Sequence, residues 1–89
     1  MYRIVLEFSG VLDDEGETAA QDIATHFAEF RRHHQNVSCV YKDRTLTLTA
    51  DNDFDPEGLA LLDEFPDCIS AFTSNTVDGT LVVKSTSRI

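Results

Sequence analysis

The chain has 89 residues, of which 42% are hydrophobic and 26% charged, so it is long enough for one hydrophobic core and too short for two. Sixteen Asp and Glu against seven Lys and Arg give a formal net charge of −9, which repels nucleic-acid phosphates and anionic lipid and argues against direct binding to either. We therefore expect one domain over residues 1–89, located in the cytoplasm, with no targeting segment and no membrane span.

The first half of the chain reads as a strand, an acidic turn and a helix. Residues 2–8 alternate apolar side chains with others, which predicts a half-buried strand. A turn-rich acidic stretch follows over residues 9–17. Thr18 and Gln21 have the spacing of a capping box, which predicts a helix that begins near Ala19. We expect this helix to carry basic residues 31–34 in its last turn and to bury a stripe made of Ala20, Ile23, Phe27, Phe30 and His34.

The middle of the chain reads as a hairpin. Residues 37–42 and 45–50 are rich in β-branched and aromatic residues and are separated by Asp43 and Arg44 alone, as in a two-residue hairpin. That turn pairs Lys42 with Thr45 and collects the larger apolar side chains of both strands on one face. The other face holds Ser38, Val40, Lys42, Thr45, Thr47 and Thr49.

A second helix and a second hairpin are expected to follow. Asp55 is a suitable N-cap, Pro56 suits the first turn, and Pro66 is expected to end the helix after about ten residues. Residues 69–77 and 80–86 then flank an Asp-Gly pair, the strongest short-range signal for a hairpin.

This order predicts an α+β fold: a ferredoxin-like split β-α-β sandwich with an extra C-terminal strand and two helices on one face of an antiparallel sheet. With the sheet order 4-1-3-2, Cys39 and Cys68 would lie in distant strands, beyond the reach of a disulfide. We expect both to be reduced thiols.

Acidic residues gather in two segments, and we interpret both as complements to helix N-termini. A calcium loop after Asp51 is excluded, because Pro56 and Leu62 stand where such a loop needs Gly and Glu. We expect the second segment to face basic residues 31–34. The segments are Asp13, Asp14, Glu15 and Glu17, and then Asp51, Asp53, Asp55 and Glu57.

The sequence shows no catalytic signature. His26 and His33 fall near one helical face, but two histidines without a third ligand do not make a zinc site, so we predict no metal. The serines lack a nucleophile motif and the glycines form no phosphate-binding loop, so we expect neither catalytic residues nor a cofactor.

These features favour a non-enzymatic protein-protein interaction module. The last hairpin is apolar on both sides, so its second side should extend an apolar patch on the open sheet face. The acidic loop would steer a basic partner, as in an inhibitor or immunity-type protein that blocks a nucleic-acid-binding surface. Edge strands offer a route to a homodimer. The predicted partner-binding residues are Asp13, Asp14, Glu15, Glu17, Val5, Val40, Ile69, Val77 and Val82.

An alternative is a small dimeric α+β-barrel enzyme or ligand-sensing regulatory domain. It would need a pocket between sheet and helices near His26, Tyr41 and Phe72.

Overall fold

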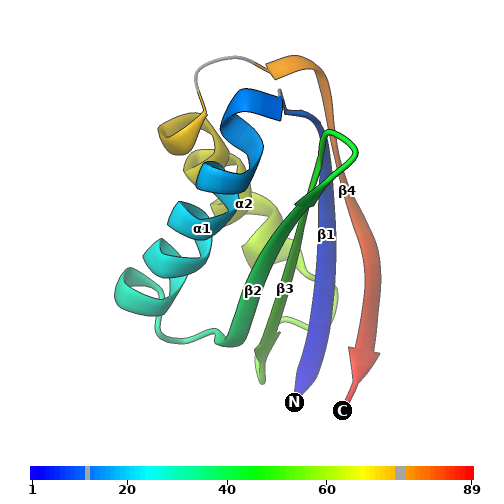
Figure 1. Cartoon of the computed structure of the whole chain (residues 1–89). Helices are drawn as coiled ribbons and strands as arrows, with labels where there is room; N and C mark the ends of the chain where they lie inside the picture. The colour runs from blue at the N-terminus through cyan, green and yellow to red at the C-terminus, as the bar shows by residue number, and fades with distance from the viewer. Residues whose placement is uncertain (12, 74–75) are drawn as a thin grey trace.

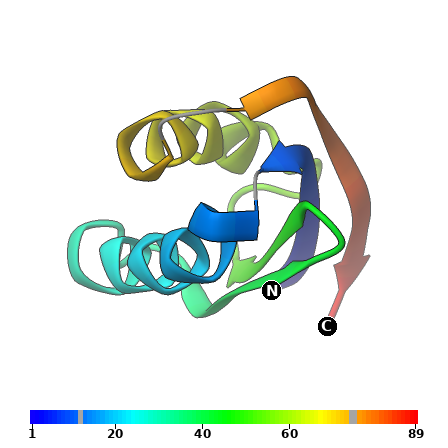
Figure 2. The same cartoon turned by 45° about the horizontal axis from the view of Figure 1, so that its top comes forward.

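The computed structural model describes residues 1–11, 13–73 and 76–89. The elements, in chain order, are β1 (Tyr2–Val11), α1 (Asp13–Phe30), β2 (Gln35–Lys42), β3 (Thr45–Asn52), α2 (Leu59–Phe72) and β4 (Thr76–Arg88). The strands form one antiparallel sheet in the order β2-β3-β1-β4, with both helices on the same face (Figures 1 and 2). The predicted α+β class and the ferredoxin-like arrangement are confirmed. Neither described helix is long and apolar enough to cross a membrane.

The predicted second hairpin is wrong. Residues 69–72 continue α2, and β4 is a single strand, so the described residues contain no extra C-terminal strand. Pro66 lies inside α2 instead of ending it. The apolar spacing of that helix continues beyond the proline, and the burial it gains outweighs the lost backbone hydrogen bond. The Asp-Gly pair lies where the pairing of β1 with β4 shifts register. The chain therefore forms a β-bulge at this pair and not a hairpin turn.

The first helix also differs from the prediction at both ends. β1 continues to Val11 and α1 begins at Asp13, so the acidic stretch forms the first turns of the helix and not a loop. Carboxylates at a helix N-terminus are favourable, which explains the early start. The helix ends at Phe30, so residues 31–34 lie beyond its last turn. Phe30 is 71% exposed and does not belong to the buried stripe.

The hairpin of β2 and β3 follows the predicted register from Lys42 opposite Thr45 to Ser38 opposite Thr49. Asp43 and Arg44 both have positive φ, at 51° and 62°, as a type I′ turn requires. The two-residue turn would also place Val37 opposite Ala50, but beyond Ser38 the register shifts and this pair does not form.

The core fills the space between the sheet and the two helices. The predicted apolar face of the hairpin lies against it, with the β3 side chains fully buried and those of β2 partly buried. The largest fully buried side chains are Phe27, Phe65, Ile4, Leu6, Ile23, Leu46, Leu48 and Leu61. Neither described helix lies on the opposite face of the sheet (Figure 2).

Both cysteines are free, but the argument that separated them is wrong, because Cys68 lies in α2 and not in a strand. Burial raises the pKa of Cys39 to about 12 and also raises the pKa of Cys68. Thiols with a raised pKa are poor nucleophiles and poor metal ligands at neutral pH.

Candidate functional site

The helices and the strands differ in the charges that they carry, and the remaining charged residues, Arg31 and Arg32 after α1 among them, lie in the loops. The sequences of α1 and α2 contain nine Asp or Glu and no Lys or Arg. The four strands contain three acidic and four basic residues. We call the described acidic side chains of the two helices the acidic helix layer: Asp14, Glu15, Glu17, Asp22, Glu29, Asp63, Glu64 and Asp67.

The predicted acidic contact residues lie at one end of this layer. Asp14 and Glu17 are exposed in the first turns of α1, and Glu15 is half-buried beside them. Asp13 begins the helix, but its side chain lies outside the described residues.

The second acidic segment is split between solvent and interior. Asp53 and Glu57 are exposed, whereas Asp51 and Asp55 are buried. Asp55 Oδ2 accepts the backbone N–H groups of Ala60 at 3.1 Å and of the next residue at 3.3 Å. The prediction that Asp55 is the N-cap residue is therefore wrong, because Gly58 holds that position, but the carboxylate of Asp55 still satisfies two N–H groups in the first turn of α2.

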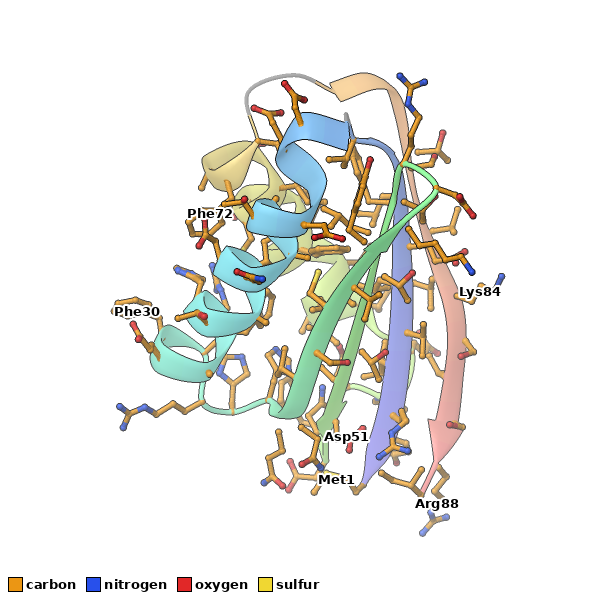
Figure 3. All side chains as sticks on the ribbon, viewed as in Figure 1. Met1, Phe30, Asp51, Phe72, Lys84 and Arg88 are labelled. Carbon is orange, nitrogen blue, oxygen red and sulfur yellow. The ribbon has the colours of Figure 1, made fainter. Side chains whose placement is uncertain are left out.

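Asp51 is held at the end of the sheet near the N-terminus (Figure 3). Arg3 donates to it through Nε at 2.9 Å and Nη2 at 3.0 Å, and Asn36 Nδ2 donates at 3.0 Å. The hydrogen bond from Arg3 is the main reason that the pKa of Asp51 lies below its usual range. Asp51 is thus a structural anchor, and it does not face residues 31–34 as predicted.

The predicted apolar patch is divided. Val40 and Val82 lie on the open sheet face with 58% and 45% exposure, and Val5 is half-buried on the same face. Thr47 and Glu7 separate the first two valines along one row of paired residues. Ile69 does not belong to this face, because it is buried in the core side of α2, and the side chain of Val77 lies outside the described residues.

A hollow of about 360 Å³ lies on this open face. It is lined mainly by hydroxyl and charged side chains, and one of these, Glu7, pairs with Lys84 Nζ at 3.5 Å. The lining residues are Glu7, Ser9, Lys42, Asp43, Thr45, Thr47, Thr80 and Val82.

The pocket expected near His26, Tyr41 and Phe72 does not form as one site. His26, Phe30 and Phe72 line a hollow of about 180 Å³. Phe30 and Phe72 lie on the side of the helices that faces away from the sheet (Figure 3). Tyr41 lines a different hollow and donates its hydroxyl to the backbone oxygen of Val11 at 2.8 Å.

A cluster that the sequence did not reveal joins the loop after α1 to α2. Both His33 and His34 direct Nε2 toward the carboxylate of Glu64, at 3.3 Å and 3.1 Å. Arg31 Nη1 approaches the same carboxylate at 3.4 Å, and Arg31 Nε is buried without a hydrogen-bond partner. The two histidine side chains are 47% and 0% exposed, and that of Glu64 is 16% exposed.

His34 is the buried centre of this cluster. Its Nδ1 lies 3.2 Å from Asn52 Nδ2, while Asn52 Oδ1 accepts the backbone N–H groups of Phe54 and Asp55 at 3.2 Å and 2.9 Å. With its oxygen occupied, Asn52 presents its NH₂ group, so His34 Nδ1 accepts and Nε2–H donates to Glu64. Burial, which outweighs the attraction of Glu64, lowers the pKa of His34, consistent with a neutral ring.

Sequence reasoning placed residues 31–34 beside the acidic segment before α2, and His34 does contact Asn52 and Phe54 of that segment. It did not identify Glu64 inside α2 as the carboxylate that Arg31, His33 and His34 approach. It also treated His26 and His33 as one pair, whereas His26 packs against the rings of Phe30 and Phe72, 5.1 Å and 5.8 Å away. The adjacent pair of histidines was the available signal, but its third member depends on how α2 packs.

The comparisons add no family or relative to this description. No family model, no curated protein and no solved structure matches the chain. What the fold and the surface define is a ferredoxin-like α+β domain with an acidic helix layer and a nearly neutral sheet face.

Proposed function

We propose that this chain is a non-enzymatic protein-binding module whose acidic helix layer contacts a basic partner protein. The observation that carries the proposal is the separation of charge, with nine acidic and no basic residues in the two helices. Carboxylates on this layer can occupy the positions on a basic surface that phosphates would otherwise take. An inhibitor or immunity-type protein that blocks a nucleic-acid-binding surface would act in this way.

The charge separation favours the helix layer over the sheet face as the contact surface. The sheet face carries nearly balanced charge, and its exposed valines are not contiguous. The two layers face opposite directions (Figure 2), so one partner docked flat against the molecule touches only one of them. The acidic helix layer can therefore both attract a basic partner at long range and form the contact with it.

The edge strand β4 supports a second candidate, a homodimer. Among the described strands it pairs with β1 alone and lies at the edge of the sheet, so its outer backbone groups can pair with a strand of another copy. Sedimentation velocity over a range of concentrations tests this candidate, and a monomer at all of them would eliminate it.

A pair of matched variants tests the main proposal. Glu17→Lys with Asp22→Lys reverses two exposed charges in the helix layer, and Glu7→Lys with Asp43→Lys makes the same change in net charge on the sheet side. Each variant and the wild type are measured against a panel of basic nucleases by biolayer interferometry, at about 50 mM and about 500 mM salt.

We expect tight binding to at least one nuclease at low salt, a steep loss at high salt, and a loss in the helix variant that the sheet variant does not share. Absence of binding across the panel would contradict the inhibitor function. Equal losses in the two variants would contradict the assignment to the helix layer.

A further inference from the structure

We propose that His33, His34 and Glu64 form a binding site for a divalent transition-metal ion, with zinc the best match to the ligands. The argument for this site does not depend on the proposed protein contact, because it rests on the geometry of the cluster, although Glu64 belongs to the acidic helix layer. It also revises the expectation from the sequence, which lacked the third ligand.

The distances in the cluster suit a tetrahedral ion. His33 Nε2 and His34 Nε2 lie 3.3 Å and 3.4 Å from the same oxygen, Glu64 Oε1, and one ligand atom from each residue lies within 4.8 Å of the others. With metal-ligand bonds of about 2.0–2.1 Å, neighbouring ligands of a tetrahedral zinc lie roughly 3.3 Å apart. Two of the three distances between the ligand atoms therefore already match those of a tetrahedral zinc site.

Arg31 contacts one oxygen of the carboxylate. Its Nη1 lies 3.4 Å from Glu64 Oε2, which His34 Nε2 also approaches at 3.1 Å, while Oε1 lies 3.3 Å from His33 Nε2 and 3.4 Å from His34 Nε2. The guanidinium therefore orients the ligand, as groups next to a metal ligand commonly do. Its positive charge opposes cation binding, and the buried carboxylate of Asp55, which acts electrostatically on His34, offsets part of that repulsion.

The exposure of the ligands points to an open site. His34 is fully buried and fixed, whereas His33 is 47% exposed, so water can reach the fourth position from the side of His33. Three protein ligands with a water molecule are the usual set of an open zinc site. Two imidazoles with one carboxylate suit zinc, nickel or cobalt better than calcium or magnesium, which prefer oxygen ligands.

Metal binding to His34 requires the side chain of Asn52 to rearrange, which lowers the affinity of the site. An ion on His34 Nε2 moves the remaining ring proton to Nδ1, which then faces the NH₂ group of Asn52. The amide must rotate, and its oxygen then leaves the backbone N–H groups of Phe54 and Asp55. A carboxylate at position 52 can accept from the ring and from the backbone together, so Asn52→Asp should tighten metal binding, by about tenfold.

Zinc titration of the untagged, chelator-treated chain tests the proposal, using isothermal titration calorimetry and the melting temperature. His33→Gln removes an exposed ligand with little risk to the fold, and His26→Gln is the matched control on α1. We expect one zinc per chain, a loss of affinity of at least about tenfold for His33→Gln, and wild-type affinity for His26→Gln. Cobalt bound at the same site should show the intense visible absorption of tetrahedral coordination.

Other results would contradict the metal site or the role of Asn52. No zinc binding by the wild type at millimolar concentration, or equal affinities for the His33 and His26 variants, would overturn the site. Weaker binding by Asn52→Asp, in a variant whose circular dichroism spectrum is unchanged, would overturn the role assigned to Asn52. Zinc binding with no binding to basic nucleases would leave the metal site standing while the proposed function fails.

Discussion

Gly16 lies buried in the first turns of α1, directly over the ring of Tyr41 on β2. A Cβ atom at position 16 would lie closer than 3.0 Å to three carbons of that ring. The ring has little freedom to retreat, because the Tyr41 hydroxyl donates to the backbone of Val11. Gly16→Ala should therefore destabilise the protein, although alanine is normally the better helix residue.

The magnitude follows from two opposing terms. Alanine in place of glycine stabilises an unstrained helix by about 1 kcal/mol. Overpacking at a tight contact costs roughly 1–3 kcal/mol. We expect Gly16→Ala to lower the free energy of unfolding by about 1 kcal/mol in the wild-type background. In a Tyr41→Ala background the clash is gone, and the same change should raise the free energy of unfolding by about 1 kcal/mol.

Urea denaturation followed by far-ultraviolet circular dichroism measures all four members of this double-mutant cycle. Thr18→Ala, an exposed change in the same helix, controls for helix propensity without a clash. The packing argument fails if Gly16→Ala is as stable as the wild type while Tyr41 is present, or if its effect is the same in both backgrounds.

Three further outcomes follow from the core, the ion pair at the sheet end and the buried thiols. Phe65→Ala should lower the free energy of unfolding by about 3–5 kcal/mol in urea titrations, against less than about 0.5 kcal/mol for the exposed Phe30→Ala, and similar losses would contradict the assigned core. The lowered pKa of Asp51 stabilises the fold above about pH 4, and this stabilisation is lost as pH falls through the folded-state pKa; Asp51→Asn should thus be less stable at pH 7, with a difference from the wild type that shrinks as pH falls below about 4, and a constant difference would refute the linkage. The buried Cys68 should react with a thiol reagent only as fast as the protein opens, whereas the partly buried Cys39, whose pKa is raised to about 12, should react more slowly than a free thiol; labelling of either cysteine at the rate of a free thiol in native buffer would contradict this.

Local sequence signals predicted the parts of the fold that depend on neighbouring residues. The two-residue turn at Asp43 and the alternation on both sides of it fixed the register of β2 and β3, because a slip of one residue would reverse both faces. The signals failed where packing overruled them. Pro66 is a local stop signal, but the apolar residues beyond it gain more by continuing α2 into the core.

The candidate sites divide in the same way. The acidic character of the surface is a property of composition, so it was visible in the sequence, whereas its separation into one layer required the correct start of α1 at Asp13. The His33, His34 and Glu64 cluster joins segments that only tertiary packing brings together. Asn52 was equally hidden, because its role depends on which of its side-chain atoms faces the ring of a distant histidine.

The position of β4 has a consequence for biosynthesis. β1 is made first, yet one of its two neighbours in the sheet is β4, and Tyr2 pairs with Arg88 across almost the whole chain. Contacts between segments so far apart in sequence form slowly. On the ribosome, one side of β1 must therefore wait unpaired until residues 76–88 have emerged, and the nascent chain is most exposed to mispairing with other strands during that interval.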